Sequence, residues 1–214
     1  MSIPEQIIGF PPALLLIGGA IMIPWLKGAL KSWFMLILPI LAFFTLLNTP
    51  NGAYWSFHIL DNQLILTRID SLSRVFGYIF CIVCLLGGIY ALGEEDDLQY
   101  CAAFGYAGGA LGVTLAGDVF SLYIFWEIMA VASTFLILAR RTKASQAAGM
   151  RYILVHIAGG LFLLAGLILY VNRTGSTGFD FIGLNTIDSY LIFVGIAVNA
   201  AIPPLHPWLS DAYP

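Results

Sequence analysis

A single carboxylate, Glu127, stands near the middle of a stretch that is otherwise apolar. The stretch covers residues 119–139 and reads VFSLYIFWEIMAVASTFLILA, 21 residues with this one charge. A hydrocarbon core of about 30 Å is crossed by about 20 helical residues, so the stretch is long enough to span a membrane. A carboxylate at that depth costs at least about 2.5 kcal/mol and usually faces a protein-lined or wet interior. Glu127 is therefore a candidate proton-transfer group, and the alternative is a structural glutamate hydrogen-bonded to a neighbouring helix.

Three further polar side chains are candidates for the same chemistry. His156 lies in the apolar stretch RYILVHIAGG, while Asn199 and His206 flank the prolines at 203 and 204. A histidine can pass protons at physiological pH, because the ordinary pKa of its side chain is about 6.5. A lone buried histidine is equally well explained as a structural hydrogen-bonding group, and for His156 both explanations remain open.

Pro203 and Pro204 interrupt the last apolar segment of the chain. The segment before them, residues 188–202, has 15 residues, or about 22 Å of helix, and apolar residues continue after the prolines. Proline removes a backbone donor and crowds the preceding turn. Irregular backbone within a membrane needs protein or water around it, and many transporters place their ion sites at broken helices. We predict a helix broken within the membrane; the alternative is a short helix that ends at the surface, followed by an interfacial loop, LHPWLSDAYP.

The composition indicates an integral membrane protein. Hydrophobic residues make up 60% of the chain and charged residues 10%, whereas a soluble domain carries about 25% charged residues. The net charge of −3, without a basic patch, argues against a nucleic-acid partner. Cys81 and Cys84 form a CxxC within an apolar segment, and we interpret them as small packing residues rather than as a metal or redox site. Glycines at 105, 108, 109 and 112 predict close helix packing rather than a nucleotide-binding loop.

Seven hydrophobic segments predict an all-α integral membrane fold with about seven transmembrane helices, the seventh broken at Pro203–Pro204. Residues 1–97 would hold the first three helices and a polar outer interval at 48–70. Within this interval, residues 57–66 alternate enough to predict a short extended or amphipathic piece outside the bilayer. Residues 98–214 would hold helices four to seven. The segments lie near residues 11–26, 32–47, 71–92, 98–117, 119–139, 147–171 and 188–202.

The distribution of basic residues predicts the orientation of the helices. If the N-terminus is outside, six basic residues fall on the inner side and three on the outer side. The positive-inside rule therefore favours an outer N-terminus and a cytoplasmic loop at 140–143. The inner six are Lys27, Lys31, Arg140, Arg141, Lys143 and Arg151, and the outer three are Arg68, Arg74 and Arg173.

Four motifs along the chain resemble those of one membrane-protein family. They resemble motifs of the antiporter-like subunits of respiratory complex I and of Mrp-type cation/proton antiporters, with the Mrp D-type branch most similar. The motifs occur in the order of the family's third, fifth, sixth and broken seventh helices. They are RIDSLSRVF at 68–76, GDVFSLYIFWEIMAVASTFLI at 117–137, AAGMRYILVH at 147–156 and IPPLHPWLSDAYP at 202–214.

The resemblance implies an inverted-repeat antiporter-like fold, with residues 98–214 as an incomplete first repeat. By resemblance, Glu127 is the fifth-helix acid of the proton channel, and His156 and His206 lie along the hydrophilic axis of the subunit. The family usually places a lysine seven residues before the motif histidine, and here that position is Asn199, which carries no charge. Family members continue through an eighth helix and a second repeat. We therefore expect the chain to be a fragment or one piece of a split subunit.

The function implied by the resemblance is translocation of protons, or of a cation against protons. The chain would be a membrane subunit of a multisubunit antiporter or of a complex I-like respiratory or hydrogenase complex, in a prokaryotic plasma (inner) membrane. The expected partners are other membrane subunits, the lipid bilayer and protons, with sodium as a second candidate ion. We expect no cofactor, no metal and no independent catalytic activity. The alternative function is a structural membrane anchor or assembly subunit that keeps the fold without conducting ions.

Overall fold

The computed structural model describes residues 9–59, 62–94 and 96–212, and most of these residues are helical. Parts of two predicted features, Leu60 and Asp61 in the polar interval and Tyr213 and Pro214 after the break, lie outside the described residues. The elements in chain order are α2 (Pro12–Met22), the 3-10 helix η1 (Ile23–Trp25), α3 (Gly28–Asn48), β1 (Gly52–Ile59), β2 (Asn62–Ile69), α4 (Ser71–Tyr90), α5 (Asp97–Leu115), α6 (Val119–Leu138), α7 (Lys143–Thr174), α8 (Ile187–Asn199) and α9 (Pro207–Ala212).

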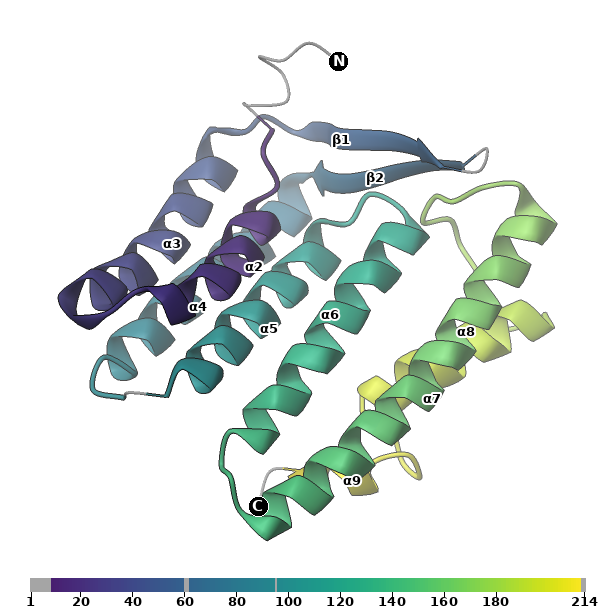
Figure 1. Ribbon diagram of the computed structural model, residues 1–214. Helices are drawn as coiled ribbons and strands as arrows, with labels where there is room; N and C mark the ends of the chain where they lie inside the picture. The colour runs from purple at the N-terminus through teal and green to yellow at the C-terminus, as the bar shows by residue number, and fades with distance from the viewer. Residues whose placement is uncertain (1–8, 60–61, 95, 213–214) are drawn as a thin grey trace.

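The helices run back and forth between two ends of the molecule (Figure 1). α5 packs against α2, α4 and α6, and the row continues from α6 to α7 and from α7 to α8. Each predicted hydrophobic segment corresponds to a helix, with α2 and η1 together forming the first. The sixth begins four residues earlier than predicted, because Thr142 and Ser145 form a capping box that starts α7 at Lys143.

Four helices of the described chain, α3, α4, α6 and α7, are long and apolar enough to cross a membrane. α2 with η1 and α8 are shorter apolar helices. The helical membrane fold is therefore confirmed. The count of seven spans, and the division of the chain at residue 97, stay predictions.

The glycines of α5 allow the neighbouring helices to approach closely, as predicted. A side chain at Gly108 would meet the backbone of α2, since its Cβ would lie 3.1 Å from the Ala13 carbonyl oxygen. At Gly109 the Cβ would lie 2.9 Å from the Met129 backbone nitrogen on α6. Small residues are typical of such contacts between membrane helices.

Cys81 and Cys84 also have the packing role predicted for them. Both are free thiols on α4. Cys81 is buried within the main hydrophobic cluster, and Cys84 packs against that cluster while partly buried.

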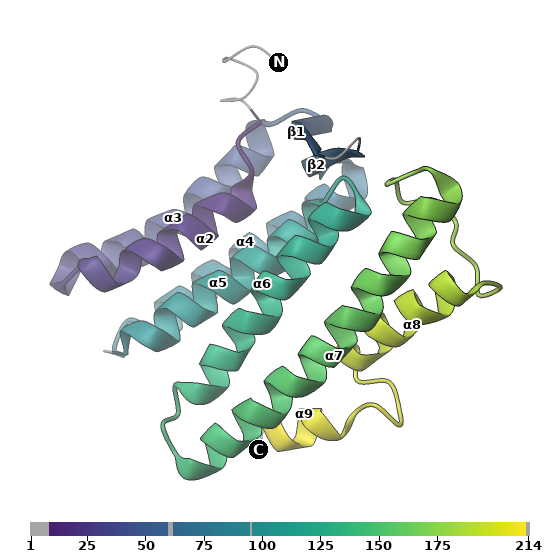
Figure 2. The same ribbon diagram turned by 45° about the vertical axis from the view of Figure 1, so that its right-hand side comes forward.

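The polar interval at 48–70 contains a β-hairpin rather than a single short extended piece. β1 and β2 pair antiparallel from Gly52↔Ile69 to Ile59↔Asn62, so the paired region is longer than residues 57–66. The hairpin lies across one end of the helices (Figures 1 and 2). The fold thus adds a two-stranded sheet to the predicted helices, because hydropathy detects membrane spans but gives only a weak signal for strands exposed outside them.

Asp118 fastens this hairpin to the turn between α5 and α6. Its side chain is buried, and one carboxylate oxygen accepts from the backbone amides of Phe120 and Ser121, both at 2.9 Å. The other oxygen accepts from the Ile65 amide on β2 at 2.6 Å and from the Ser121 hydroxyl at 2.5 Å. The carboxylate therefore caps α6 and holds a strand at the same time.

The motif at 68–76 connects β2 of the hairpin to α4 and contacts the C-terminal end of α3. Asp70 caps α4, and the amide of Ser73 that donates to its carboxylate lowers the pKa of Asp70 below its usual range. Arg74 donates to the Leu46 carbonyl at 2.6 Å and to the Thr49 carbonyl at 2.7 Å. The guanidinium thereby satisfies carbonyl groups at the C-terminal end of α3, which have no partner within that helix.

Ion pairs connect the ends of helices and the loops that the distribution of basic residues predicts to lie on the inner side of the membrane. At the end opposite the hairpin, Lys31 pairs with Asp97, and Arg141 pairs with Asp96 at 3.0 Å. The grouping of these loops at one end is as predicted. Which end faces the cytoplasm stays a prediction.

We predict that the end carrying the loop between α6 and α7 is cytoplasmic. Single cysteines at Ala144 and Asn172, exposed positions near the two ends of α7, provide a matched pair in a background in which the three native cysteines are replaced. An impermeant maleimide added to intact cells should label position 172 and not position 144, and inverted vesicles should give the reverse. Labelling of position 144 from outside would reverse the topology.

We also predict that Asp118→Ala lowers stability at the hairpin end. The change removes a helix cap, which alone contributes about 0.5–2 kcal/mol, and leaves the Ile65 amide without its acceptor. The assembled protein should unfold at a lower temperature, and the Ile65 amide should exchange with deuterium faster. Glu94→Ala, at an exposed carboxylate at the opposite end of the helices, is the control and should change neither measurement. Unchanged exchange at Ile65 in Asp118→Ala would contradict the assigned role.

Candidate functional site

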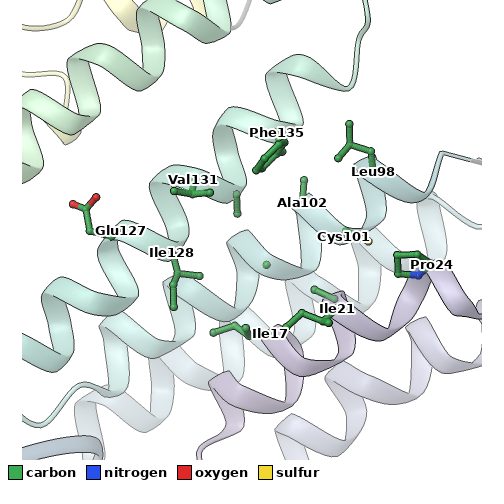
Figure 3. Close-up of a pocket in the computed structure, with 13 residues that line it drawn as sticks. Ile17, Ile21, Pro24, Leu98, Cys101, Ala102, Glu127, Ile128, Val131 and Phe135 are labelled. Carbon is green, nitrogen blue, oxygen red and sulfur yellow. The ribbon is translucent and has the colours of Figure 1, made fainter.

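Glu127 lies near the middle of α6, at the edge of a cavity between α2, α5 and α6. The cavity has a volume of about 520 Å³, and its other lining residues are apolar or small. Figure 3 shows the Glu127 carboxylate pointing away from the labelled apolar side chains of this cavity. Those lining side chains include Ile17, Ile21, Ile128, Val131 and Phe135. On the side facing the cavity, Glu127 is therefore surrounded by apolar side chains.

The carboxyl group itself faces α7. A side chain at Gly160 would collide with Glu127 Oε1, so this glycine makes the space that the carboxyl group occupies. Oε1 is buried and has no hydrogen-bond partner among the described residues. The Tyr123 side chain, one turn earlier on α6, also interacts with the carboxyl group. A buried polar atom without a partner is uncommon and costly, and it calls for an explanation.

His156 is buried on α7 and connects this helix to the end of α8. Its Nδ1 lies 3.0 Å from the Tyr152 carbonyl oxygen, and its Nε2 lies 2.9 Å from Asn199 Oδ1. Asn199 is the last residue of α8. The structure thus brings together two of the predicted site residues, which are 43 positions apart in the chain.

Aromatic rings enclose His156 on two sides. The Tyr152 ring stacks on the imidazole with 3.8 Å between centroids, and the Trp208 ring meets it edge-on at 4.6 Å. The Tyr152 hydroxyl lies 2.5 Å from the Ser133 hydroxyl on α6. Hydrogen bonds therefore join α6, α7 and α8 through Ser133, Tyr152, His156 and Asn199, with the contact from Tyr152 to His156 made by the Tyr152 backbone carbonyl and not by its hydroxyl. Ser133, Tyr152 and Trp208 were not identified from the sequence.

The Glu127 carboxyl group of α6 faces the side of α7 that also carries His156. Gly160, which faces the carboxyl group, follows His156 by four residues, so the two positions differ by about 6 Å along the helix axis and share a face. Both positions are near the middle of the 32-residue α7. The opposite face of α7 exposes large apolar side chains, among them Leu154, Leu161 and Phe162. The polar groups therefore face the protein interior at mid-helix depth.

Small residues allow α7 and α8 to approach closely enough for the His156–Asn199 contact. A Cβ at Gly159 would lie 2.9 Å from the Val198 side chain, and a Cβ at Gly195 would lie 2.7 Å from the Leu163 Cβ. A third glycine, Gly166, faces the Ile192 backbone in the same way. Any larger side chain at these positions would separate the two helices.

The predicted break in the last helix begins at Ala200, three residues before Pro203. Pro203 cannot follow a helix here, because its ring would crowd the carbonyl four residues earlier, that of Asn199. Ala201 takes a left-handed conformation (φ 52°), and the Ile202 amide donates to the Ala197 carbonyl at 3.0 Å, which is the pattern of a Schellman motif. The helix end therefore forms directly after the residue that contacts His156.

α9 folds back from the break against α7. The Trp208 indole N–H donates to the Val198 carbonyl at 2.8 Å, and Arg151 holds Asp211 through two hydrogen bonds of 2.5 and 2.7 Å. Val198 lies in the last turn of α8, and its carbonyl also accepts from the Ala201 amide at 3.2 Å, so the indole adds a second hydrogen bond at this helix end. A second cavity of about 320 Å³ lies here, lined by Tyr106, Met129, Ala130, Tyr152, Asn199, Trp208 and Leu209.

His206 is placed apart from the other predicted site residues. It is exposed in the 200–206 connection, and its carbonyl accepts from the Leu209 amide at the start of α9. The described part of the chain contains no group of three or more His, Cys, Asp or Glu side chains that could hold a metal ion.

Comparisons with known proteins agree with this architecture. Residues 116–214 match the family described as "NADH:quinone oxidoreductase/Mrp antiporter, TM". Hydrogenase-4 component B of Escherichia coli is 27% identical over 161 residues, which cover 69% of this chain and 24% of that protein. The Na(+)/H(+) antiporter subunit A1 of Staphylococcus aureus is 28% identical over 223 residues, which cover 90% of this chain and 28% of that protein.

A solved structure has the same fold over nearly the whole chain. A chain of the membrane-bound sulfane sulfur reductase, an archaeal respiratory membrane complex, superimposes with a TM-score of 0.77 at 22% identity, covering 99% of this chain and 48% of that one.

The chain spans about a quarter of the length of these two curated relatives and about half of the structural neighbour. Because the Mrp relative named here is an A1 subunit, a closer relation to the D-type branch stays a prediction. The resemblance itself is confirmed: residues 116–214 match the model of this family, and the similar proteins are a hydrogenase component and an antiporter subunit.

Proposed function

We propose that this chain forms part of a proton-translocating membrane subunit in which the Glu127 carboxyl group takes up and releases the proton. The observation that carries the proposal is the buried Glu127 Oε1, which has no partner among the described residues and faces Gly160 at mid-helix depth. Ionisable groups inside a membrane usually mark ion or proton pathways. An oxygen that no fixed donor occupies is available to hold a proton or to meet a water.

His156 is the group to which we assign the next position along the path. It lies one helical turn from the site of Glu127, and its imidazole can both accept and donate a proton. The cavity of about 320 Å³ beside Asn199 and Trp208 gives water a place next to this end of the path. The direct cationic partner that the family usually supplies on the seventh helix is replaced here by Asn199. We therefore assign proton exchange to a glutamate–histidine path instead of a glutamate–lysine pair.

We further propose that the chain works together with other membrane subunits in a prokaryotic plasma membrane. The named relatives are a component of a hydrogenase and a subunit of a Na(+)/H(+) antiporter, so each is one part of a larger assembly. Protons are the proposed substrate, and sodium is the second candidate ion.

Glu127→Gln should lower proton transport by the assembled complex by about 100-fold or more, because the amide cannot carry the proton. The glutamine has nearly the same shape, so the amount of assembled complex in the membrane should stay unchanged. The measurement is proton uptake into vesicles that contain the complex. Transport near the wild-type rate would favour the alternative of a structural anchor or assembly subunit.

Gly160→Ala should impair transport without removing any polar group. The added methyl would collide with Glu127 Oε1 and push the carboxyl group out of the α6–α7 interface, at a packing cost of about 1–3 kcal/mol. Gly87→Ala is the matched control, since a Cβ there has nothing within 4 Å and should favour the helix. We expect slow transport in the first variant and normal transport in the second. Equal rates in both would show that the carboxyl group does not need its place beside Gly160.

A further inference from the structure

Both ring nitrogens of His156 face oxygen atoms. Nδ1 lies 3.0 Å from the Tyr152 carbonyl oxygen, and Nε2 lies 2.9 Å from Asn199 Oδ1. A backbone carbonyl only accepts hydrogen bonds, so Nδ1 carries a hydrogen and donates it to Tyr152. This contact leaves Nε2 as the nitrogen at which a proton is gained or lost.

The two charge states of His156 need opposite partners at Nε2. In the neutral ring with hydrogen on Nδ1, Nε2 is an acceptor and needs a donor opposite it. In the imidazolium, Nε2 carries a hydrogen and needs an acceptor. The Asn199 side chain offers both, because its amide has an oxygen that accepts and a nitrogen that donates. A half-turn about the bond that carries the amide exchanges the two atoms.

We propose that Asn199 is a positioning residue whose amide turns with the protonation of His156. The amide oxygen faces Nε2 when the ring is an imidazolium, and the amide nitrogen faces it when the ring is neutral. The proton arrives at or leaves Nε2, and no other covalent bond changes. This inference rests on the proposed proton path and assigns a role to the position where the family usually has a lysine.

The surroundings of Asn199 allow this rotation. The side chain is only partly buried and borders the cavity of about 320 Å³. Its backbone is held at the end of α8 by the Schellman motif, and α8 is held against α7 by glycines. The Asn199 amide can therefore rotate while the backbones of α7 and α8 stay in place. A lysine would offer only donors and an ionised aspartate only acceptors, so each would match one charge state of His156.

Few other titratable groups of the described residues face His156. On its own helix Tyr152 stacks on the ring, from α6 Glu127 faces the next turn of α7, and from α5 Tyr106 lines the adjacent cavity. α9 presents the uncharged Trp208 ring, and Asp211 of α9 is paired with Arg151. The acidic residue of α8, Asp188, lies at the opposite end of that helix and pairs with Arg173. The hydrogen-bond partner of Nε2 is therefore Asn199.

The test compares proton transport against pH in the complex carrying Asn199→Asp or Asn199→Leu. Asn199→Asp supplies only acceptors when ionised and favours the imidazolium, so the pH of half-maximal transport should rise by about one unit. Asn199→Leu leaves the second N–H of the imidazolium without an acceptor, so that pH should fall by about as much. Asn172→Asp and Asn172→Leu make the same changes at an exposed position and should shift nothing. Shifts in the same direction, or no shift in either Asn199 variant, would overturn the inference.

A second measurement does not depend on transport. In the complex labelled with ¹⁵N-histidine, the signals of His156 are those lost in His156→Gln. We expect Nδ1 to remain protonated throughout and Nε2 to titrate, with the titration moving in opposite directions in Asn199→Asp and Asn199→Leu. A neutral ring with its hydrogen on Nε2 would overturn the inference. Because this readout persists when Glu127→Gln stops transport, failure of the proposed proton path and failure of the amide rotation can be distinguished.

Discussion

The arrangement of the site depends on one constraint: a polar group inside a bilayer has to find its partners within the protein. In this chain, α7 presents Leu154, Leu161 and Phe162 on one face and His156 on the other. The polar side chains of α6, α7 and α8 can therefore meet only in the space between these helices. Ser133, Tyr152, His156 and Asn199 form a connected series there because the surrounding hydrocarbon offers no alternative partner.

Close packing is the second requirement for this series. A hydrogen bond of 2.9 Å between short side chains on neighbouring helices is possible only if the helix axes lie near each other. Gly159 and Gly195 make that approach possible between α7 and α8, and Gly160 leaves the space for the carboxyl group of α6. The glycines thus set the distances over which the hydrogen bonds between these helices form.

Much of the fold and part of the site could be predicted from the sequence, for physical reasons that differ between residues. Glu127 and the break at Pro203 were predicted because a charge in an apolar stretch and a proline in a helix are local signals. The His156–Asn199 contact was not predicted, since it depends on how α8 is rotated about its axis against α7. Trp208 was missed for the same reason: its partners become visible only when α9 folds back. The hairpin was found only in part, because exposed strands lack the long apolar run of a membrane span.

The hydrogen bonds of Asp118 hold one end of the molecule more firmly than the other end is held. At the hairpin end, Asp118 joins β2 to α6, and the Val119 amide donates to the Thr177 carbonyl. These bonds hold together the hairpin, the turn between α5 and α6 and the connection between α7 and α8. At the other end, the pairs that hold α9 and the loops include exposed side chains such as Arg141 and Arg151, which water and salt can loosen. Movement of the helices is consequently restrained at the hairpin end and freer at the opposite end. A rearrangement at the broken helix would therefore leave the hairpin end in place and displace the opposite ends of the helices.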